Sequence, residues 1–402
     1  MLPTCLQAYS GQIVDIDSHE QMPAQVWIEK FGEVARPIAE ELMSWPARDA
    51  NSSNVPDYEG DVLEIDPNTL WSMKGPKSPG AVDIKRRPEV LDTMHINRQL
   101  MFPTSIGMWG ALLATSPIGS ALHKKFGSGP DYASKLFAAH NEWAIESAKV
   151  SPRIRPVALL YGKDPDELHN VCSALLKQGI RAFVIISGLP PGGVSPAASS
   201  LDRLYSLLEE SDAALTLHIG GQTAFMQTTV WGDAEAFDGF KMNEEINMSP
   251  WRLSSIHLAA QNFLAAMITG GVFDRHPRLR VGAMEFGAHW IGPLANLLDL
   301  WHDNNQSITV KSFKDGTESR RLPLKPSEYI ARNIRVSPFD FEPVDQYIDN
   351  FGLEDVYCFG SDYPHIEGGK NPLKTLSETM SRLGPRMLEK FFVKNGELLF
   401  PK

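Results

Sequence analysis

Short apolar segments recur along the chain, and each is followed by a polar loop and then by a helical pattern of apolar positions. Eight such segments can be counted, at 12–17, 98–103, 155–160, 181–187, 214–219, 279–285, 333–338 and 355–362. Amphipathic stretches separate several of them, at 131–149, 164–179 and 200–212. Strands that alternate with helices in this way predict a parallel sheet, and eight units predict an α/β protein with a (β/α)8 TIM barrel.

Three connections are longer than this alternation requires. Residues 24–92, rich in Pro, Gly, Ser and Asn, separate the first two segments, and the stretches 189–200 and 220–251 follow the fourth and fifth. Extra loop length at the carboxyl ends of barrel strands commonly builds the pocket. We therefore expect a single domain over residues 1–402, with long insertions after strands 1 and 5 and with 24–92 as an inserted lid or arm.

Composition and charge limit the partners of this chain. Its 402 residues are 43% apolar and carry a formal charge of -11, which favours a globular protein and argues against nucleic acid as a partner. The chain offers no stretch of about 18 uncharged apolar residues, and its start lacks a basic region followed by a long apolar run. We therefore expect no membrane association and a cytoplasmic location. Three dispersed cysteines predict neither a disulfide framework nor a thiolate metal site.

Ionisable side chains stand at the carboxyl ends of four predicted strands. They are Asp15, Asp17 and His19 on the first strand, His218 on the fifth, Glu285 on the sixth and Asp362 on the eighth. Residues i and i+2 of a strand share a face, so Asp17 and His19 are expected to face one ion, with Asp15 deeper on the same side. Two imidazoles and two carboxylates would suit Zn²⁺, Mn²⁺ or Fe²⁺.

Each of these residues also has a structural interpretation. A single histidine on a strand is usually a hydrogen-bonded structural residue, and aspartates at strand ends often cap the following helix. Burying Asp17 and Asp362 with neither a cation nor donors nearby would, however, cost several kcal/mol. The joint pattern therefore favours a metal site over the structural interpretation.

The motifs around these residues resemble the amidohydrolase superfamily, in the branch called amidohydrolase-related family 2. That branch includes aminocarboxymuconate-semialdehyde decarboxylase, other aromatic-acid decarboxylases and some carbon–carbon bond hydrolases. The stretch "VDIDSHEQMP" is similar to its opening D-x-H-x-H motif, with Asp17 in the place of the first histidine. "HINRQLMFPT", residues 268–294 and "CFGSDYPHIEG" are similar to its second-strand, sixth-strand and final motifs. The resemblance covers most of 12–20 and 93–400 and leaves 24–92 unexplained.

The resemblance implies a divalent metal cofactor, one ion or two, held by Asp17, His19, His218 and Asp362. It also implies that Asp362 handles protons as a general base and that His365, in "DYPH", orients this carboxylate without binding the metal. An aspartate in the place of the first imidazole makes the ligand set more anionic, which shifts its preference from Zn²⁺ toward Mn²⁺ or Fe²⁺.

Glu285 departs from the family pattern, because the related decarboxylases have a histidine after the sixth strand. A glutamate there is open to three roles: a ligand for a second ion, a proton carrier, or an anchor for a cationic part of the substrate. His289 would lie one helical turn above Glu285 if a helix began there, and could then replace the missing imidazole as a catalytic group.

Together these observations predict a metal-dependent hydrolase that uses a metal-activated water on an amide, ester or activated carbon–carbon bond of a small carboxylated or aromatic compound. The alternative on the same scaffold is a non-oxidative decarboxylase of an aromatic or muconate-type acid. A third hypothesis is a barrel that no longer catalyses and serves as a binding or assembly module. Motifs of serine hydrolases, phosphate loops and dinucleotide sites are absent from the sequence. The resemblance further implies a homodimer.

Overall fold

The computed structural model describes most of the chain. It covers residues 2–46, 53–127, 129–226, 228–239, 249–304, 309–311 and 319–400.

Eight parallel strands form two sheets that share a curved α/β arrangement. The strands are β1 (Ile13–Asp15), β2 (Ile96–Met101), β3 (Ile154–Pro156), β4 (Ala158–Leu159), β5 (Ala182–Ile186), β6 (Ala214–His218), β7 (Arg280–Met284) and β10 (Ile334–Val336). One sheet has the order β1-β2-β3 and the other β10-β7-β6-β5-β4. Because β3 and β4 are separated by Val157 alone, the third predicted strand is one segment that serves both sheets. The fold is that of a TIM barrel, as predicted.

The eighth predicted strand, 355–362, differs from the expectation. Within the described residues this segment makes isolated bridges, Val336 to Tyr357 and Ser18 to Tyr363, instead of a continuous ladder. It still joins the two sheets, because Ile16 donates its backbone N–H to the carbonyl of Phe359 on one side and Val336 bridges to Tyr357 on the other. The backbone turns away from extended geometry where the segment ends, at Asp362 (φ 51°).

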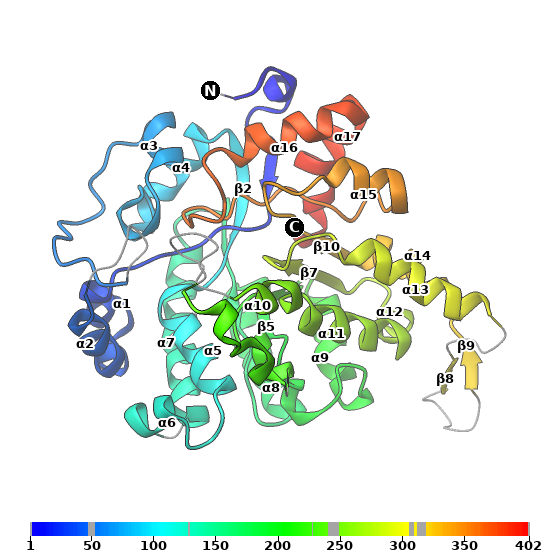
Figure 1. Cartoon of the computed structure of the whole chain (residues 1–402), viewed down its shortest axis with the longest axis horizontal. Coiled ribbons are helices and arrows are strands. Elements are labelled where there is room, and N and C mark those ends of the chain that lie inside the picture. Colours follow the sequence, from blue (N-terminus) through cyan, green and yellow to red (C-terminus); the bar gives the residue numbers. More distant parts are fainter. Residues whose placement is uncertain are drawn as a thin grey trace.

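Helices surround the strands (Figure 1). They are α1 (Trp27–Phe31), α2 (Arg36–Ser44), α3 (Pro67–Ser72), α4 (Arg87–Thr93), α5 (Ser105–Thr115), α6 (Ala121–Phe126), α7 (Gly129–Ala148), α8 (Pro165–Lys177), α9 (Asp202–Glu210), α10 (Pro250–Ser255), α11 (Leu258–Thr269), α12 (Val272–Arg275), α13 (Ile291–Asp303), α14 (Pro326–Asn333), α15 (Val344–Phe351), α16 (Pro372–Met380) and α17 (Pro385–Glu389). The three amphipathic stretches noted in the sequence correspond to α7, α8 and α9. The short antiparallel pair β8 (Thr309–Lys311) and β9 (Ser319–Arg321) extends from the end of α13 in Figure 1.

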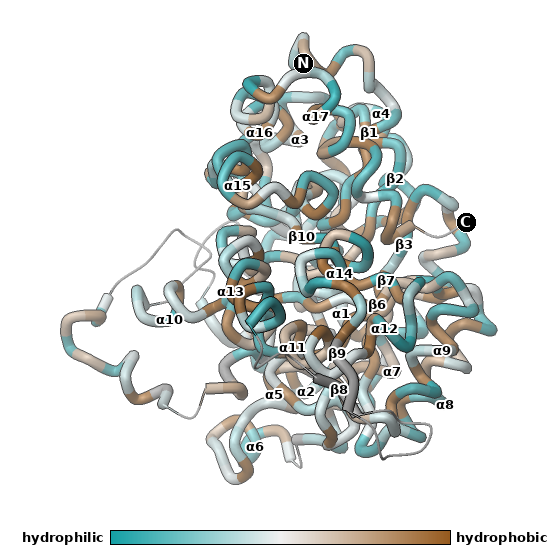
Figure 2. The backbone as a smooth tube through the Cα atoms, turned by 90° about the vertical axis from the view of Figure 1, so that its right-hand side faces the viewer, coloured by the Kyte–Doolittle hydropathy of each residue, from teal (hydrophilic) through white to brown (hydrophobic). Residues whose placement is uncertain are grey.

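The central strands β5 and β6 are buried on both faces, which explains their nearly continuous apolar sequences. All five residues of β5, "AFVII", are buried, and Figure 2 shows apolar segments, in brown, among the strands and on the helices around them. Registers pair Ile186 with His218 and His218 with Met284, so the ends of β5, β6 and β7 lie at the same level. None of the described helices combines the length and apolar character needed to cross a bilayer.

The insertion 24–92 packs against the barrel through its own helices α1 to α4 (Figure 1, blue). Gln21 donates its backbone N–H to the carbonyl of Ala81, and the Tyr363 hydroxyl donates to the carbonyl of Pro79. The insertion therefore contacts both the first and the last strand ends. Its predicted role as a lid or arm is a question of movement and stays a prediction.

Candidate metal centre

Five ionisable side chains from distant parts of the sequence converge at the carboxyl ends of the strands. Asp17 and His19 follow β1, His218 ends β6, Glu285 follows β7 and Asp362 belongs to the last segment. Each is between 1% and 7% exposed. Two overlapping groups, His19 with Glu285, Asp362 and His365, and Asp17 with His19 and His218, each have ligand atoms within 4.8 Å of one another.

The Nε2 atoms of the two imidazoles lie close to the oxygens of the three carboxylates. His19 Nε2 lies 3.2 Å from Asp362 Oδ1, 3.6 Å from Asp17 Oδ1 and 3.8 Å from Glu285 Oε2. His218 Nε2 lies 3.0 Å from Glu285 Oε2 and 3.4 Å from Asp17 Oδ1. The four ligands expected from the sequence and Glu285 therefore face a single point.

Several atoms at this point have no hydrogen-bond partner, although they are buried. They are Asp17 Oδ1, His19 Nε2, His218 Nε2, Glu285 Oε2 and both carboxylate oxygens of Asp362. An unsatisfied buried polar group costs about 1–3 kcal/mol, and more when it is charged. A cation among these atoms would satisfy all of them at once, which is a physical reason for the sequence to place them together.

The backbone is also unusual at two of these residues. Glu285 (φ 61°) and Asp362 (φ 51°) adopt left-handed conformations, which cost roughly 1–2 kcal/mol for residues other than glycine. Both residues directly follow the end of a strand segment, and the turn redirects the side chain to the cluster. Strain of this kind is concentrated at functional sites, where the surrounding structure enforces it.

A second set of hydrogen bonds fixes the imidazole rings. His218 Nδ1 bonds the carbonyl of Ile219 at 3.0 Å, so this nitrogen carries the proton and Nε2 presents its lone pair to the cluster. His365 Nδ1 lies 3.1 Å from Asp362 Oδ1, and the His365 ring stacks on the His19 ring with the two centroids 3.9 Å apart. His365 thus lies beside Asp362, and the orienting role expected from the sequence stays a prediction.

Asp15 lies behind the cluster and connects its first and last strand segments. It accepts hydrogen bonds from the backbone N–H groups of Asp17 (3.1 Å) and Ser361 (2.9 Å) and from the Ser361 hydroxyl (2.6 Å). Burial raises the pKa of Asp15 to about 7. Ser337 performs a similar function for the cluster itself, because its hydroxyl donates to Asp17 Oδ2 and accepts from the backbone N–H of Glu285.

The pKa values of the cluster residues depend on the charges of their neighbours. Burial and the nearby carboxylate of Asp362 raise the pKa of Glu285 well above its usual range. Burial alone would lower the pKa of His218, but the carboxylates of Glu285 and Asp17 raise it above its usual value. Protons therefore balance the buried negative charge when no other cation is present. A divalent ion would take their place.

The donor set fits a divalent transition-metal ion. Imidazole nitrogens suit Zn²⁺, Fe²⁺ and Mn²⁺, and the high proportion of carboxylates favours the harder ions among them. Asp17, His19, His218 and Asp362 offer the ligands expected from the sequence, and Glu285 offers a fifth.

The structure does not bring His289 into this cluster. α13 begins at Ile291, so Glu285 and His289 lie in the preceding bend, and the expectation that they are one helical turn apart is wrong. The His289 side chain is 47% exposed, its Nδ1 is 3.5 Å from Glu342 Oε1, and its ring meets that of His257 edge-on. A direct catalytic role for His289 stays a prediction.

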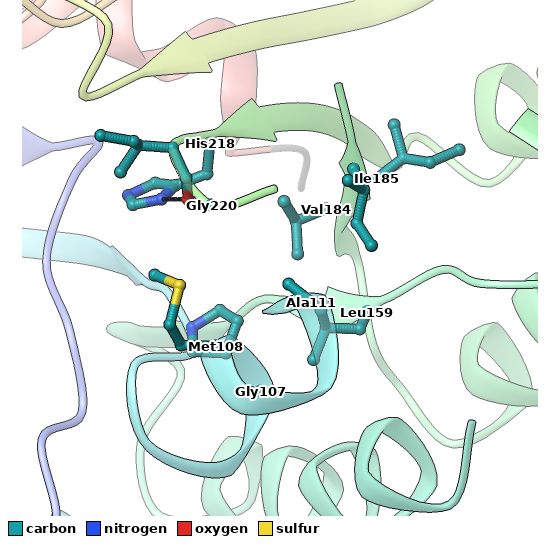
Figure 3. A pocket seen from close by; sticks show the side chains of 11 residues that line it. Gly107, Met108, Ala111, Leu159, Val184, Ile185, His218 and Gly220 are labelled. Atoms are coloured by element: carbon teal, nitrogen blue, oxygen red, sulfur yellow. Dashed lines mark hydrogen bonds between the residues drawn. The ribbon is translucent and has the colours of Figure 1, made fainter. Parts of the chain in front are cut away.

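An apolar pocket adjoins the cluster at His218. It is lined by Pro103, Gly107, Met108, Ala111, Leu159, Val184, Ile185, Ile186, His218, Ile219 and Gly220. Figure 3 shows His218 at one side of the pocket and Met108 and Ala111 of α5 at the other. The Nε2 atom of His218 thus lies at the cluster, and the rest of the ring lines the apolar pocket.

A small acidic recess also adjoins the cluster. It is lined by Asp17, Glu285, Ser337, Pro338, Phe339, Asp340, Gly360, Asp362, Glu367 and Gly368. The cluster therefore borders both an apolar pocket and an acidic one.

Comparisons with known proteins agree with this arrangement. A family model described as Amidohydrolase matches residues 124–402, more than half of the chain, and this range includes His218, Glu285 and Asp362. No curated protein matches the sequence significantly.

Solved structures resemble the chain over nearly its full length. An amidohydrolase from Mycobacterium avium subsp. paratuberculosis K-10 is 18% identical with a TM-score of 0.66, covering 97% of this chain and 99% of that one. 5-Carboxyvanillate decarboxylase from Sphingomonas paucimobilis is 15% identical with a TM-score of 0.60 and the same coverage. A dihydroxybenzoic acid decarboxylase from Polaromonas sp. JS666, with bound manganese and the inhibitor 2-nitroresorcinol, is 14% identical with a TM-score of 0.59, covering 96% of each chain. At these identities the likeness establishes the fold.

Proposed function

We propose a reaction for this chain, which belongs to the amidohydrolase family. In this proposal it is a metal-dependent enzyme that removes the carboxylate of a small aromatic acid as CO₂. The observation that carries the proposal is the junction at His218 between a cluster of unsatisfied metal-ligating atoms and an apolar pocket. Aromatic-acid decarboxylases with the same fold, one of them with manganese bound, support this choice over hydrolysis.

In this proposal Asp17, His19, His218 and Asp362 hold a single divalent ion. When bound, such an ion supplies a Lewis acid for the oxygens of the substrate carboxylate and of a neighbouring ring hydroxyl. The protein residues do the remaining work. Asp15 and Ser337 hold Asp17 in place, and His365 orients Asp362.

The aromatic ring of the substrate occupies the apolar pocket. Ala111, Val184 and Ile186 offer it surfaces that exclude water, and Met108 offers a polarisable thioether. Excluding water also strengthens the electrostatic interactions between the substrate and the charged groups of the cluster.

The reaction requires one proton to reach the ring carbon. The bond between this carbon and the carboxylate breaks, its electron pair stays on the ring carbon, and a proton takes the place of the departing CO₂. Glu285 is the proton donor in this proposal, because its Oε2 is buried at the cluster and 3.0 Å from His218 Nε2.

The test is a decarboxylation assay with purified protein loaded with Mn²⁺. Substrates would include 2,6-dihydroxybenzoate and 5-carboxyvanillate, with CO₂ release measured by a coupled assay. The variant Asp362→Asn should lose activity. Asp345→Asn should retain it, because Asp345 is similarly buried (8% exposed, against 7% for Asp362) but pairs with Arg382 far from the cluster. Failure of the Mn²⁺-loaded protein to release CO₂ from a broad panel of hydroxylated aromatic acids would overturn the proposal.

Hydrolysis is the second candidate, and one observation favours it. Asp362 combines two oxygens free of hydrogen bonds with a flanking imidazole from His365, an arrangement suited to a general base that takes a proton from water. Incubation with aryl esters and amides in ¹⁸O-labelled water separates the two reactions. Incorporation of ¹⁸O into a carboxylic acid product indicates hydrolysis, whereas CO₂ release with a proton added to the ring indicates decarboxylation.

A further inference from the structure

We propose that Thr104 is a positioning residue that determines which ring nitrogen of His19 faces the metal, an inference that rests on the proposed function. Thr104 lies immediately before α5 and is separated from His19 by 85 residues. Its hydroxyl oxygen lies 2.9 Å from His19 Nδ1 and 3.0 Å from His365 Nε2. One hydroxyl thus joins a metal-ligating imidazole to the imidazole that contacts Asp362.

The bonding capacity of the hydroxyl fixes the direction of this chain. A hydroxyl has one proton to donate, so between the two imidazoles it accepts from one ring and donates to the other. If His19 Nε2 gives its lone pair to a metal, Nδ1 carries the proton and donates to Thr104. The Thr104 hydroxyl then donates to His365 Nε2, which leaves the ring proton of His365 on Nδ1.

The last step of the chain reaches Asp362. His365 Nδ1 is 3.1 Å from Asp362 Oδ1, so a proton on this nitrogen lies close to the carboxylate. The same tautomers therefore present a lone pair from His19 and a fully ionised, oriented carboxylate from Asp362. If the Thr104 hydroxyl donated to His19 Nδ1 instead, His19 Nε2 would carry a proton in place of its lone pair, and His365 Nδ1 would have no proton for Asp362. Thr104 therefore couples the states of the two ligands His19 and Asp362.

The position of the Thr104 hydroxyl is itself fixed by the protein. The buried Glu20 carboxylate accepts the backbone N–H groups of Thr104 and Ser105, each at 2.8 Å, and the Ser105 hydroxyl at 2.6 Å. Glu20 follows His19 directly in the sequence, so its carboxylate ties the segment that carries the histidine to the start of α5, where Thr104 lies. These contacts locate the oxygen before any metal binds.

The test compares Thr104→Val with Thr104→Ser. Valine has the shape of threonine but no hydroxyl, whereas serine keeps the hydroxyl and loses the methyl group. The measurement is the dissociation constant of Mn²⁺ from metal-free protein by calorimetry, together with the melting temperature of the metal-free protein. We expect Thr104→Val to weaken Mn²⁺ binding by about 10–100-fold, a range typical of residues that orient metal ligands. Thr104→Ser should remain within about threefold of the natural protein.

A matched control is available at Thr216. This residue is fully buried in β6, and its hydroxyl donates to the carbonyl of Phe183 at 2.7 Å. Thr216→Val thus removes a buried hydroxyl that is bonded to a backbone carbonyl instead of to an imidazole, and is expected to leave Mn²⁺ affinity unchanged.

Each outcome bears on the proposal. Equal Mn²⁺ affinity in Thr104→Val and the natural protein would overturn it, and so would equal losses in the valine and serine variants, since the methyl group would then be responsible. A natural protein that binds no Mn²⁺ would overturn both this inference and the proposed function. Normal Mn²⁺ binding that depends on the Thr104 hydroxyl, without decarboxylation, would leave this inference standing while the proposed reaction fails.

Discussion

A proton-linked loss of stability should arise at His140, far from the cluster. His140 is fully buried in α7, with the ring of Trp143 5.6 Å away. Burial lowers the pKa of His140 to about 4, against the opposing effect of a hydrogen bond with Asn141, whereas an unfolded histidine has a pKa of 6.5. The folded chain therefore resists protonation at a pH where the unfolded chain accepts it.

The sign and magnitude follow from this difference. Below pH 6.5 the unfolded state binds a proton that the folded state does not, so stability falls as the pH falls, until the folded histidine also protonates near pH 4. Each unit of pKa difference corresponds to 1.36 kcal/mol, which gives about 3.4 kcal/mol over the full range. Between pH 7 and pH 5 the expected loss from this single group is about 2 kcal/mol.

The assay is denaturant unfolding of metal-free protein at pH 7 and pH 5, with circular dichroism and fluorescence compared to check that unfolding is two-state. His140→Leu has a similar volume and cannot titrate, so its free energy of unfolding should fall by about 2 kcal/mol less than that of the natural protein. His169→Leu, at a partly buried position of α8, serves as the control for the substitution of a histidine by leucine. Identical pH dependence in His140→Leu and the natural protein would refute the reasoning.

Three further predictions concern the site. Mn²⁺ at 100 times its dissociation constant should raise the free energy of unfolding by about 2.7 kcal/mol in denaturant titrations. Chelation should remove both this gain and the activity. The absence of any stabilisation would contradict a metal centre. His218→Ala should lower the rate of CO₂ release at least about 100-fold with an unchanged circular dichroism spectrum, and a smaller loss would exclude this residue from the ligand set. Ala111→Phe fills the apolar pocket and should raise KM for the aromatic acid without altering Mn²⁺ affinity, so an unchanged KM would place the ring elsewhere.

Much of the barrel and of the candidate ligand set could be predicted from the sequence, because both depend on local patterns. Fully buried parallel strands read as apolar runs, and the end of each run marks the edge where side chains of a barrel converge. Asp17 and His19 are two residues apart on one such edge, and His218 ends another. The structure places these residues together with Asp362, as the spacing had indicated.

The errors occur where geometry depends on tertiary contacts. The sequence after β7 does not reveal that Glu285 has a left-handed backbone or that a bend delays α13 until Ile291, so the expected helical relation with His289 fails. The segment 355–362 has the composition of a strand but turns at Asp362 to bring its carboxylate to the cluster.

Other residues at the site lacked a sequence signal of their own. Thr104 and Glu20 acquire a role only because distant segments meet, and a threonine before a helix is otherwise an ordinary cap. The choice between hydrolysis and decarboxylation was also beyond the sequence, since the pocket beside His218 is built from four separate elements.

The buried guanidinium of Arg87 gives the insertion 24–92 a further significance. Arg87 is fully buried, lies over the ring of Tyr363, and donates through Nη2 to the carbonyl of His19. Transplanting the candidate site into another barrel would thus require the inserted segment as well as the strand-end motifs. A chimera that lacked it would leave the peptide that carries His19 without the hydrogen bond from Arg87.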